Sequence, residues 1–270
     1  MNTPTVLTDI DARGVATVTL NRPDKHNAFD DAMIALLRNA FDALAGRDEV
    51  RVVILASLGK SFSAGADLAW MKRMADYDYA HNLKDAELLA AMLKALHDLP
   101  QPTIAKVQGA AYGGAVGLAS CCDIAIGSQR ASFALSEVKI GLIPATISPY
   151  VIRSIGERAA RRYFTTGERF DAREAHRLGL LHEVVAEDQL DSAVIAMVES
   201  LLTSAPLAAR AAKELITQVA GRAIDAELIA DSCSRIASIR VSQEGQEGLT
   251  AFLTKRQPKW LSNEANGAKE

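Results

Sequence analysis

The sequence predicts an α/β fold followed by a helical region. Up to about residue 142, short β-rich runs alternate with helical patterns, which is the order expected for a mostly parallel sheet with helical crossovers. Two of these runs pass directly into turns that contain glycine, and a helical pattern follows each turn. From Pro144 onward the strand signal fades, and one helical pattern follows another.

The first half of the chain carries four predicted strands and four predicted helices. The strands cover residues 6–10, 15–20, 51–56 and 103–107. The helices cover Asp30 to about Ala45, Leu68 through Met74, 85–99 and 115–122. Gly14 ends a hairpin turn between the first two strands, and residues 77–82 interrupt the helical pattern.

The second half is predicted to be a series of helices, at about 146–155, 157–166, 171–178, 188–202, 206–219, 224–239 and 242–254. Asp171 and Glu174 have the spacing of a capping box, and Gly179 stands at the C-terminal end of the same helix. The later helices have leucine and isoleucine faces that must be buried against something. We expect the residues after Trp260 to be frayed.

Composition and charge narrow the class of protein. The chain has 270 residues and is 49% hydrophobic, enough for one large domain or a domain with an appendage. The net charge of −3 without a basic cluster argues against nucleic acid as the main partner. No run is long enough to span a bilayer, and the N-terminus has no signal-peptide pattern. Three cysteines make neither a disulfide framework nor a metal site, so we expect a cytoplasmic protein without a bound metal.

The stretch from Val107 to Leu142 carries the candidate chemistry. Gly113 and Gly114 form a turn before a helix of small residues, so backbone N–H groups and the helix N-terminus can approach a ligand. Glu137 follows as a single carboxylate among apolar neighbours, which can raise its pKa. Backbone donors and one isolated acid describe a site that stabilises an oxyanion and moves a proton.

A second glycine turn lies upstream. The loop over 61–67 follows the strand at 51–56 and precedes the helix from Leu68. Two such loops can each supply one N–H group to a common carbonyl oxygen. Either turn alone is weak evidence, because tight turns of this kind occur in many α/β proteins without a catalytic role.

The two motifs Ser63-Ala-Gly-Ala-Asp-Leu68 and Gly109-Ala-Ala-Tyr-Gly-Gly114, with Cys122-Asp-Ile-Ala125, resemble the enoyl-CoA hydratase/isomerase (crotonase) family. The resemblance implies a crotonase-like ββα spiral with two near-perpendicular sheets over residues 1–195. It further implies a C-terminal helical trimerisation region over 196–260, before a flexible tail at 261–270. The implied ligand is an acyl-CoA thioester, with no separate cofactor, and the implied assembly is a homotrimer or a dimer of trimers.

Matched to the family motifs, the N–H groups of Ala66 and Gly114 would form the oxyanion hole, and Glu137 would transfer the proton. A surface glutamate paired with Lys139 or Arg130 is the alternative for Glu137. The resemblance also implies substrate contacts for a larger set of residues: Lys25, Ala64, Asp67, Leu68, Gly113, Gly117, Phe252 and Lys255. Of these, Phe252 and Lys255 match a family segment that can reach a neighbouring subunit's CoA. By spacing alone, the loop with Arg22, Lys25 and His26 would be a solvated loop.

Gly117 departs from the pattern of the two-acid hydratases, which place a second glutamate at this position. The wider sequence resembles bacterial 3-methylglutaconyl-CoA hydratases and relatives that act on isohexenylglutaconyl-CoA. An isomerase that uses Glu137 alone is an alternative, and a non-catalytic thioester-binding protein is a second. The carboxylate of a glutaconyl group would need a cation, for which Lys72, Arg73 and Arg153 are candidates.

Overall fold

A six-stranded sheet forms the centre of the protein in the computed structural model, which describes residues 4–261. Its strands run in the order β1-β2-β3-β4-β6-β9. Their bounds are Val6–Ile10 (β1), Val15–Leu20 (β2), Val52–Ser57 (β3), Thr103–Val107 (β4), Ile124–Ser128 (β6) and Glu183–Val185 (β9). All neighbours pair in parallel except β1 and β2, which form the predicted antiparallel hairpin. The prediction of a mostly parallel sheet is confirmed.

A second sheet of three short strands stands beside the glycine turns. It has the order β5-β7-β8, with bounds Ala110–Tyr112 (β5), Ser132–Ala134 (β7) and Arg169–Asp171 (β8). The expectation that strands end before Pro144 is wrong, because β8 and β9 both come later. Strands of three residues are too short for an alternating pattern to show in the sequence.

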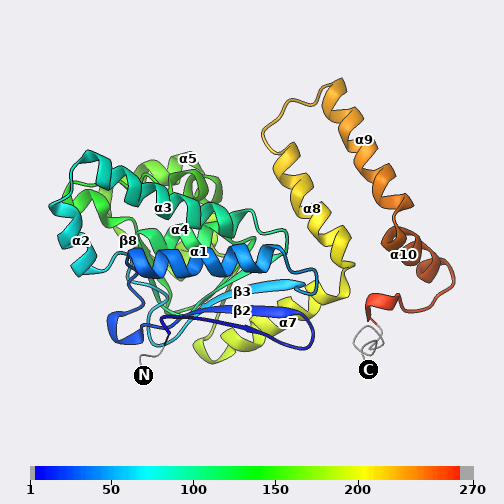
Figure 1. Ribbon diagram of the computed structural model, residues 1–270, viewed down its shortest axis with the longest axis horizontal. Coiled ribbons are helices and arrows are strands. Elements are labelled where there is room, and N and C mark those ends of the chain that lie inside the picture. Colours follow the sequence, from blue (N-terminus) through cyan, green and yellow to red (C-terminus); the bar gives the residue numbers. More distant parts are fainter. Residues whose placement is uncertain (1–3, 262–270) are drawn as a thin grey trace.

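Helices cover both faces of the six-stranded sheet (Figure 1). Helices α1 (Asp31–Ala45) and α3 (Tyr79–His97) lie over one face, and α7 (Leu190–Thr203) lies over the other. Successive residues of β3 point to opposite faces: Val52 packs with α7, whereas Val53 belongs to the core beneath α1. A sheet buried on both faces explains the nearly continuous apolar runs of its inner strands.

Two helix boundaries differ from those predicted. Helix α3 begins at Tyr79, so the expected break over 77–82 is wrong for its last residues. The Asp78 side chain caps this end by accepting a hydrogen bond from the N–H of His81 at 2.9 Å. The first turn is exposed and polar, so it carries no apolar periodicity. Helix α5 (Ser148–Thr166) joins two predicted helices across a kink at Gly156.

The remaining helices of the body are α2 (Leu68–Ala75), α4 (Gly114–Cys121) and α6 (Ala172–Leu178). At α6 the Asp171 side chain accepts a hydrogen bond from the N–H of Glu174 at 2.8 Å. The Glu174 carboxylate bonds to Tyr163 and Arg177 instead. Only one half of the predicted capping box is therefore present.

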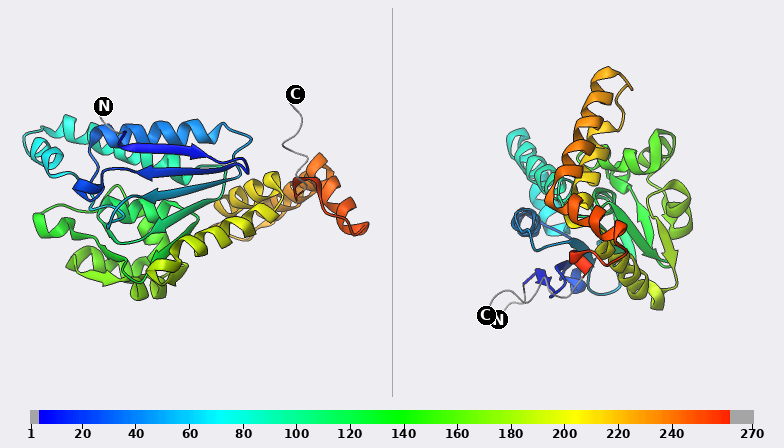
Figure 2. Two further views of the ribbon diagram at one scale, coloured as in Figure 1. Left: turned by 90° about the horizontal axis from the view of Figure 1, so that it is seen from below. Right: turned by 90° about the vertical axis from the view of Figure 1, so that its right-hand side faces the viewer.

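The last three helices form an arm that extends from the body (Figures 1 and 2). They are α8 (Pro206–Val219), α9 (Ala226–Val241) and α10 (Gln243–Leu253), and Leu228 and Ala251 are the only buried apolar residues within them. Among residues 4–261 no single helix is long and apolar enough to cross a membrane; one bent pair, residues 187–203 with 206–219, passes that test by length and composition. The predicted tail lies, from residue 262 on, outside the described residues.

Polar bonds hold the base of the arm against the body. Arg210 of α8 donates a hydrogen bond to the carbonyl oxygen of Val50 at 2.9 Å. Lys213 forms an ion pair with Asp123 at 2.7 Å and also donates a hydrogen bond to Gln101 at 3.0 Å. Lys213 and Arg210 are both mostly buried, so these bonds are shielded from water.

Gly109 lies between β4 and β5, where the backbone packs directly against Lys60 and Ser61, and glycine is required there. A Cβ atom at this position would lie 2.0 Å from the carbonyl oxygen of Lys60. We expect Gly109→Ala to lower the free energy of unfolding by about 1–3 kcal/mol because the backbone must move to admit the methyl group. Gly46→Ala is the matched control, since nothing lies within 4 Å of its added Cβ. Thermal denaturation of both variants is the measurement, and equal midpoints would contradict the prediction.

Candidate active site

The two predicted glycine turns lie side by side. A parallel bridge joins them: the N–H of Ser63 donates to the carbonyl oxygen of Ala110, and the N–H of Tyr112 donates to that of Ser63, both at 3.0 Å. Gly65 has a φ of +87°, and a Cβ there would lie 2.7 Å from the Tyr112 carbonyl oxygen. Only glycine fits this close approach.

Each turn leaves one backbone N–H group without a partner beside the same cavity. Gly114 is the first residue of α4, so its N–H has no acceptor within the helix. Phe29 bonds to the two neighbours of Ala66: its N–H donates to the carbonyl oxygen of Gly65, and its carbonyl oxygen accepts from the N–H of Asp67. The N–H of Ala66 takes no part in this bridge. Within residues 4–261 neither N–H has a hydrogen-bond acceptor, and both residues line the cavity.

Glu137 faces these groups from a short 3-10 helix, Ser136–Ile140. Its Oε1 atom lies 3.1 Å from the place where a Cβ on Gly113 would stand, directly beside the turn. Its Oε2 atom is buried and has no hydrogen-bond partner in the described part of the chain. Burial raises the pKa of this carboxyl above its ordinary value.

The alternative for Glu137, a surface glutamate paired with a cation, is wrong. Arg130 pairs instead with Glu187 at 2.5 Å. Within the described residues, Lys139 makes no ion pair with Glu137. The Lys139 side chain packs beside Gly167 instead. The Glu137 carboxylate therefore faces the cavity without an ion-pair partner among the described residues.

The cavity in front of Glu137 has a volume of about 590 Å³. Its wall comes from α2, α3, the start of α4 and the segment 141–147. Most of the lining side chains are apolar: Phe29, Trp70, Met74, Ala86, Leu89, Leu142, Ile143, Pro144, Ala145 and Ile147. An apolar wall with a few polar groups is typical of a small-molecule site.

Gly117 does not line this cavity. A Cβ on Gly117 would lie 2.3 Å from Cγ2 of Ile147 and 3.5 Å from Leu93, so both side chains already occupy the space above it. The substrate contact that the resemblance implied for Gly117 therefore stays a prediction, because Ile147 covers this residue in the structure. Ile147 covers the position where the two-acid pattern has its second glutamate.

Asp67 serves the structure of the site. Its carboxylate caps α2 by accepting hydrogen bonds from Ala69 and Trp70, and it pairs with Arg22 at 3.0 Å. Lys25 lies 3.4 Å from the same carboxylate. Burial raises the pKa of Asp67, but the hydrogen bonds from Ala69 and Trp70 and the nearby Lys25 lower it below its ordinary value. Asp67 therefore ties the loop at 22–28 to the second glycine turn.

The other predicted binding residues are on the surface of the chain. Ala64 and Leu68 are exposed near the second turn, the latter to 81%. Phe252 is also 81% exposed, at the end of α10, and Lys255 follows it with a left-handed φ of 56°. Helix α10 lies at the opposite end of the molecule from α2, so these two residues do not reach the cavity of their own chain (Figure 1).

The candidate cations lie outside the cavity wall. Arg73 pairs with Asp31 at 2.6 Å, and Lys72 and Arg153 are exposed. The sequence did not indicate that Trp70 and Asp85 would meet, although Nε1 of Trp70 donates a hydrogen bond to Oδ2 of Asp85 at 3.0 Å. The turn between α2 and α3 brings them together, and no local pattern signals that turn.

Comparison with known proteins agrees with this geometry. The enoyl-CoA hydratase/isomerase family model matches residues 11–263. A solved enoyl-CoA hydratase from Shewanella pealeana is 47% identical, with a TM-score of 0.92, and the match covers 95% of this chain and 96% of that one. The 2,3-dehydroadipyl-CoA hydratase of Escherichia coli is 32% identical over 246 residues, which are 90% of this chain and 94% of that protein.

A relative with a different activity is also similar. The trans-2-decenoyl-(acyl-carrier-protein) isomerase of Streptococcus mutans is 31% identical over 261 residues, 94% of this chain and 97% of that protein. The match to solved hydratases over nearly the whole length shows the crotonase fold that the sequence predicted. This chain belongs to the enoyl-CoA hydratase/isomerase family.

Proposed function

We propose that the protein is an enoyl-CoA hydratase that adds water to an α,β-unsaturated acyl-CoA. The observation that carries the proposal is the Oε2 atom of Glu137, which is buried without a partner in front of two unbonded N–H groups. A buried polar atom without a hydrogen bond lowers the stability of the fold, so its presence calls for a functional reason.

The proposed reaction uses the thioester oxygen as the electron sink. The N–H groups of Ala66 and Gly114 donate hydrogen bonds to this oxygen as it gains negative charge. The Glu137 carboxylate takes a proton from water, and the hydroxide oxygen bonds to the β-carbon. The resulting enolate then recovers that proton at its α-carbon, so one water molecule is added in full.

A protein that only binds thioesters is less consistent with this site. Such a protein would gain nothing from an uncompensated carboxylate, and a glutamine would fill the same space without the charge. The raised pKa of Glu137 is the property that a general base needs.

An isomerase is the second candidate, and the position of Ile147 favours it. Ile147 occupies the space that a second acid at Gly117 would need, and Glu137 is the carboxylate that lies against the turn at Gly113. A single base can remove the α-proton of a 3-enoyl thioester and return it to the γ-carbon. One carboxylate also suffices for syn addition of water, so product analysis must decide between them.

The resemblance suggested a 3-methylglutaconyl-CoA or isohexenylglutaconyl-CoA type of substrate, and this finer assignment stays a prediction. A glutaconyl group carries a carboxylate that needs a cationic partner. No lysine or arginine lines the described cavity. Such a substrate would therefore depend on a cation from a neighbouring chain.

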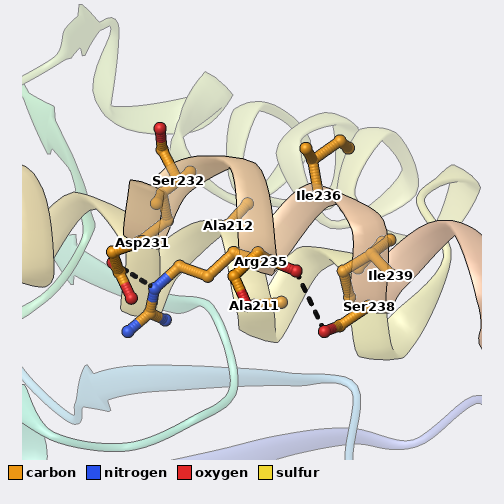
Figure 3. Close-up of a pocket in the computed structure, with 11 residues that line it drawn as sticks. Ala211, Ala212, Asp231, Ser232, Arg235, Ile236, Ser238 and Ile239 are labelled. Atoms are coloured by element: carbon orange, nitrogen blue, oxygen red, sulfur yellow. Dashed lines mark hydrogen bonds and ion pairs between the residues drawn. The ribbon is translucent and has the colours of Figure 1, made fainter. Parts of the chain in front are cut away.

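We further propose that the arm packs against other copies of the chain, as a trimer or a multiple of three. Its exposed apolar side chains include Ile216 at 69%, Val241 at 78% and Leu253 at 76%. A groove of about 440 Å³ lies between α8 and α9. Figure 3 shows residues that line it, among them Ala211 and Ala212 of α8 and Ile236 and Ile239 of α9. Exposed apolar surface of this extent is typical of a subunit interface.

Glu137→Gln should reduce turnover by roughly two to four orders of magnitude, because the amide cannot accept the proton. Binding of the thioester should persist, since the side chain keeps its size. Steady-state kinetics with crotonyl-CoA and calorimetric binding of a saturated acyl-CoA are the measurements. Glu87→Gln removes an exposed carboxylate from α3 and is the control. Normal turnover in a folded Glu137→Gln variant would refute the proposal.

The same substitution should stabilise the fold at neutral pH. The raised pKa of Glu137 means that the unfolded chain loses this proton at a lower pH than the folded chain does. The wild type therefore loses stability as the pH rises from the ordinary glutamate pKa through the raised one, whereas the variant does not. The melting temperature of the variant should therefore exceed that of the wild type by an amount that grows as the pH rises through this range. A difference that does not change with pH would contradict the prediction.

Ala66→Pro should lower turnover by roughly two to three orders of magnitude, because it removes one donor to the oxyanion. It breaks no hydrogen bond within the described chain, since this N–H is free. Proline at Gly114 is a poorer test, because its Cβ would lie 2.5 Å from the ring of Phe29. Turnover is compared in variants whose melting temperature and thioester binding are retained. Full activity would exclude Ala66 as a donor.

Sedimentation velocity should show a trimer or a multiple of three. Ile216→Asp places a charge on the apolar face of α8 and should shift the protein toward smaller species. Ile195→Asp, at a 55% exposed position on α7 of the body, is the matched control. A wild type that sediments as a monomer at micromolar concentration would rule out the assembly.

A further inference from the structure

The wall of the cavity carries one charged group besides Glu137, and this group is the carboxylate of Asp85 on α3. Its side chain is half-buried. It forms no ion pair with any lysine, arginine or histidine of the described chain. The cavity therefore contains two carboxylates and, from its own chain, no cation.

The indole of Trp70 holds the Asp85 carboxylate in place. Nε1 of Trp70 donates to Oδ2 at 3.0 Å, and Oδ1 has no hydrogen-bond partner among residues 4–261. Trp70 is only 4% exposed and belongs to α2, the helix that Asp67 caps beside the second glycine turn. The position of Asp85 is thus fixed relative to the loop that carries Ala66.

Most of the remaining wall is apolar, and Asn82 and Thr146 are its neutral polar residues. Met74, Leu89 and Ile143 lie on it and offer methyl and methylene surface to an acyl chain. Burial of such a chain is favourable by about 0.8 kcal/mol for each CH₂ group. A terminal carboxylate in the same place would lose its hydration and meet a like charge without a compensating cation.

We infer that the cavity selects acyl-CoA thioesters whose acyl chain has an uncharged end, and that Asp85 determines this specificity by repelling a terminal carboxylate. The inference rests on the proposed function, because it names the acyl group that the same site accepts. It opposes the prediction of a glutaconyl-type substrate. Selectivity of this kind comes from a repulsive element as well as from apolar contact.

The test uses two substrates that differ only at the chain end. Trans-2-hexenoyl-CoA has a methyl group where 2,3-dehydroadipyl-CoA has a carboxylate. The wild type should prefer hexenoyl-CoA by at least about 100-fold in kcat/KM, and Asp85→Asn should reduce this ratio by about tenfold or more. The gain should come from the carboxylated substrate, because asparagine can still accept the hydrogen bond from Trp70.

Glu87→Gln is the matched control, since it removes the same charge from the exposed side of α3 and should leave the ratio unchanged. Calorimetric binding of hexanoyl-CoA and adipyl-CoA gives a second readout that does not need turnover. The proposed reaction fails if no thioester is hydrated. This inference still stands in that case if hexanoyl-CoA binds more tightly than adipyl-CoA and Asp85→Asn reduces the difference between the two affinities. The inference would be overturned if the wild type hydrated and bound the thioesters with methyl and carboxylate ends equally well. It would also be overturned if Asp85→Asn left the ratio of the two kcat/KM values unchanged.

Discussion

The short bridge between Ser63 and Ala111 is the contact on which the site depends. Its two hydrogen bonds, each of 3.0 Å, join loops that follow different strands of the large sheet. Because each loop leads into a helix, the bridge places two helix N-termini at the edge of one cavity. Backbone donors held in this way need no rearrangement when charge develops on a bound oxygen. Glycine is required at position 65, since a Cβ there would collide with the carbonyl oxygen of Tyr112 on the opposite segment.

The chemistry of the site follows from one carboxylate and from what surrounds it. Glu137 is half-buried and its Oε2 atom has no partner in the described chain; burial raises the pKa of this carboxyl, which faces the cavity. Ile147 fills the space above Gly117 and keeps a second acid away from the turn. The same isoleucine lines the cavity, so a single apolar side chain both forms part of the wall and covers Gly117.

Much of this arrangement could be predicted from the sequence, because its signals are local. The two glycine turns and the isolated Glu137 are visible as short motifs, and the parallel sheet follows from alternating strands and helices. Other features depend on contacts between distant residues. The contact of Ile147 with Gly117 and the bond between Trp70 and Asp85 have no local signature. Strands of three residues also escape detection, since tertiary pairing rather than periodicity defines them.

The ion pair between Lys213 and Asp123 has a consequence for the geometry of an assembly. Asp123 also accepts hydrogen bonds from the N–H and hydroxyl of Thr103 at the start of β4, so the first arm helix is attached to the central sheet itself. A rotation of α8 would break several shielded bonds at once. The direction in which α8 leaves the body is therefore fixed by bonds within the chain, before any other molecule touches the arm.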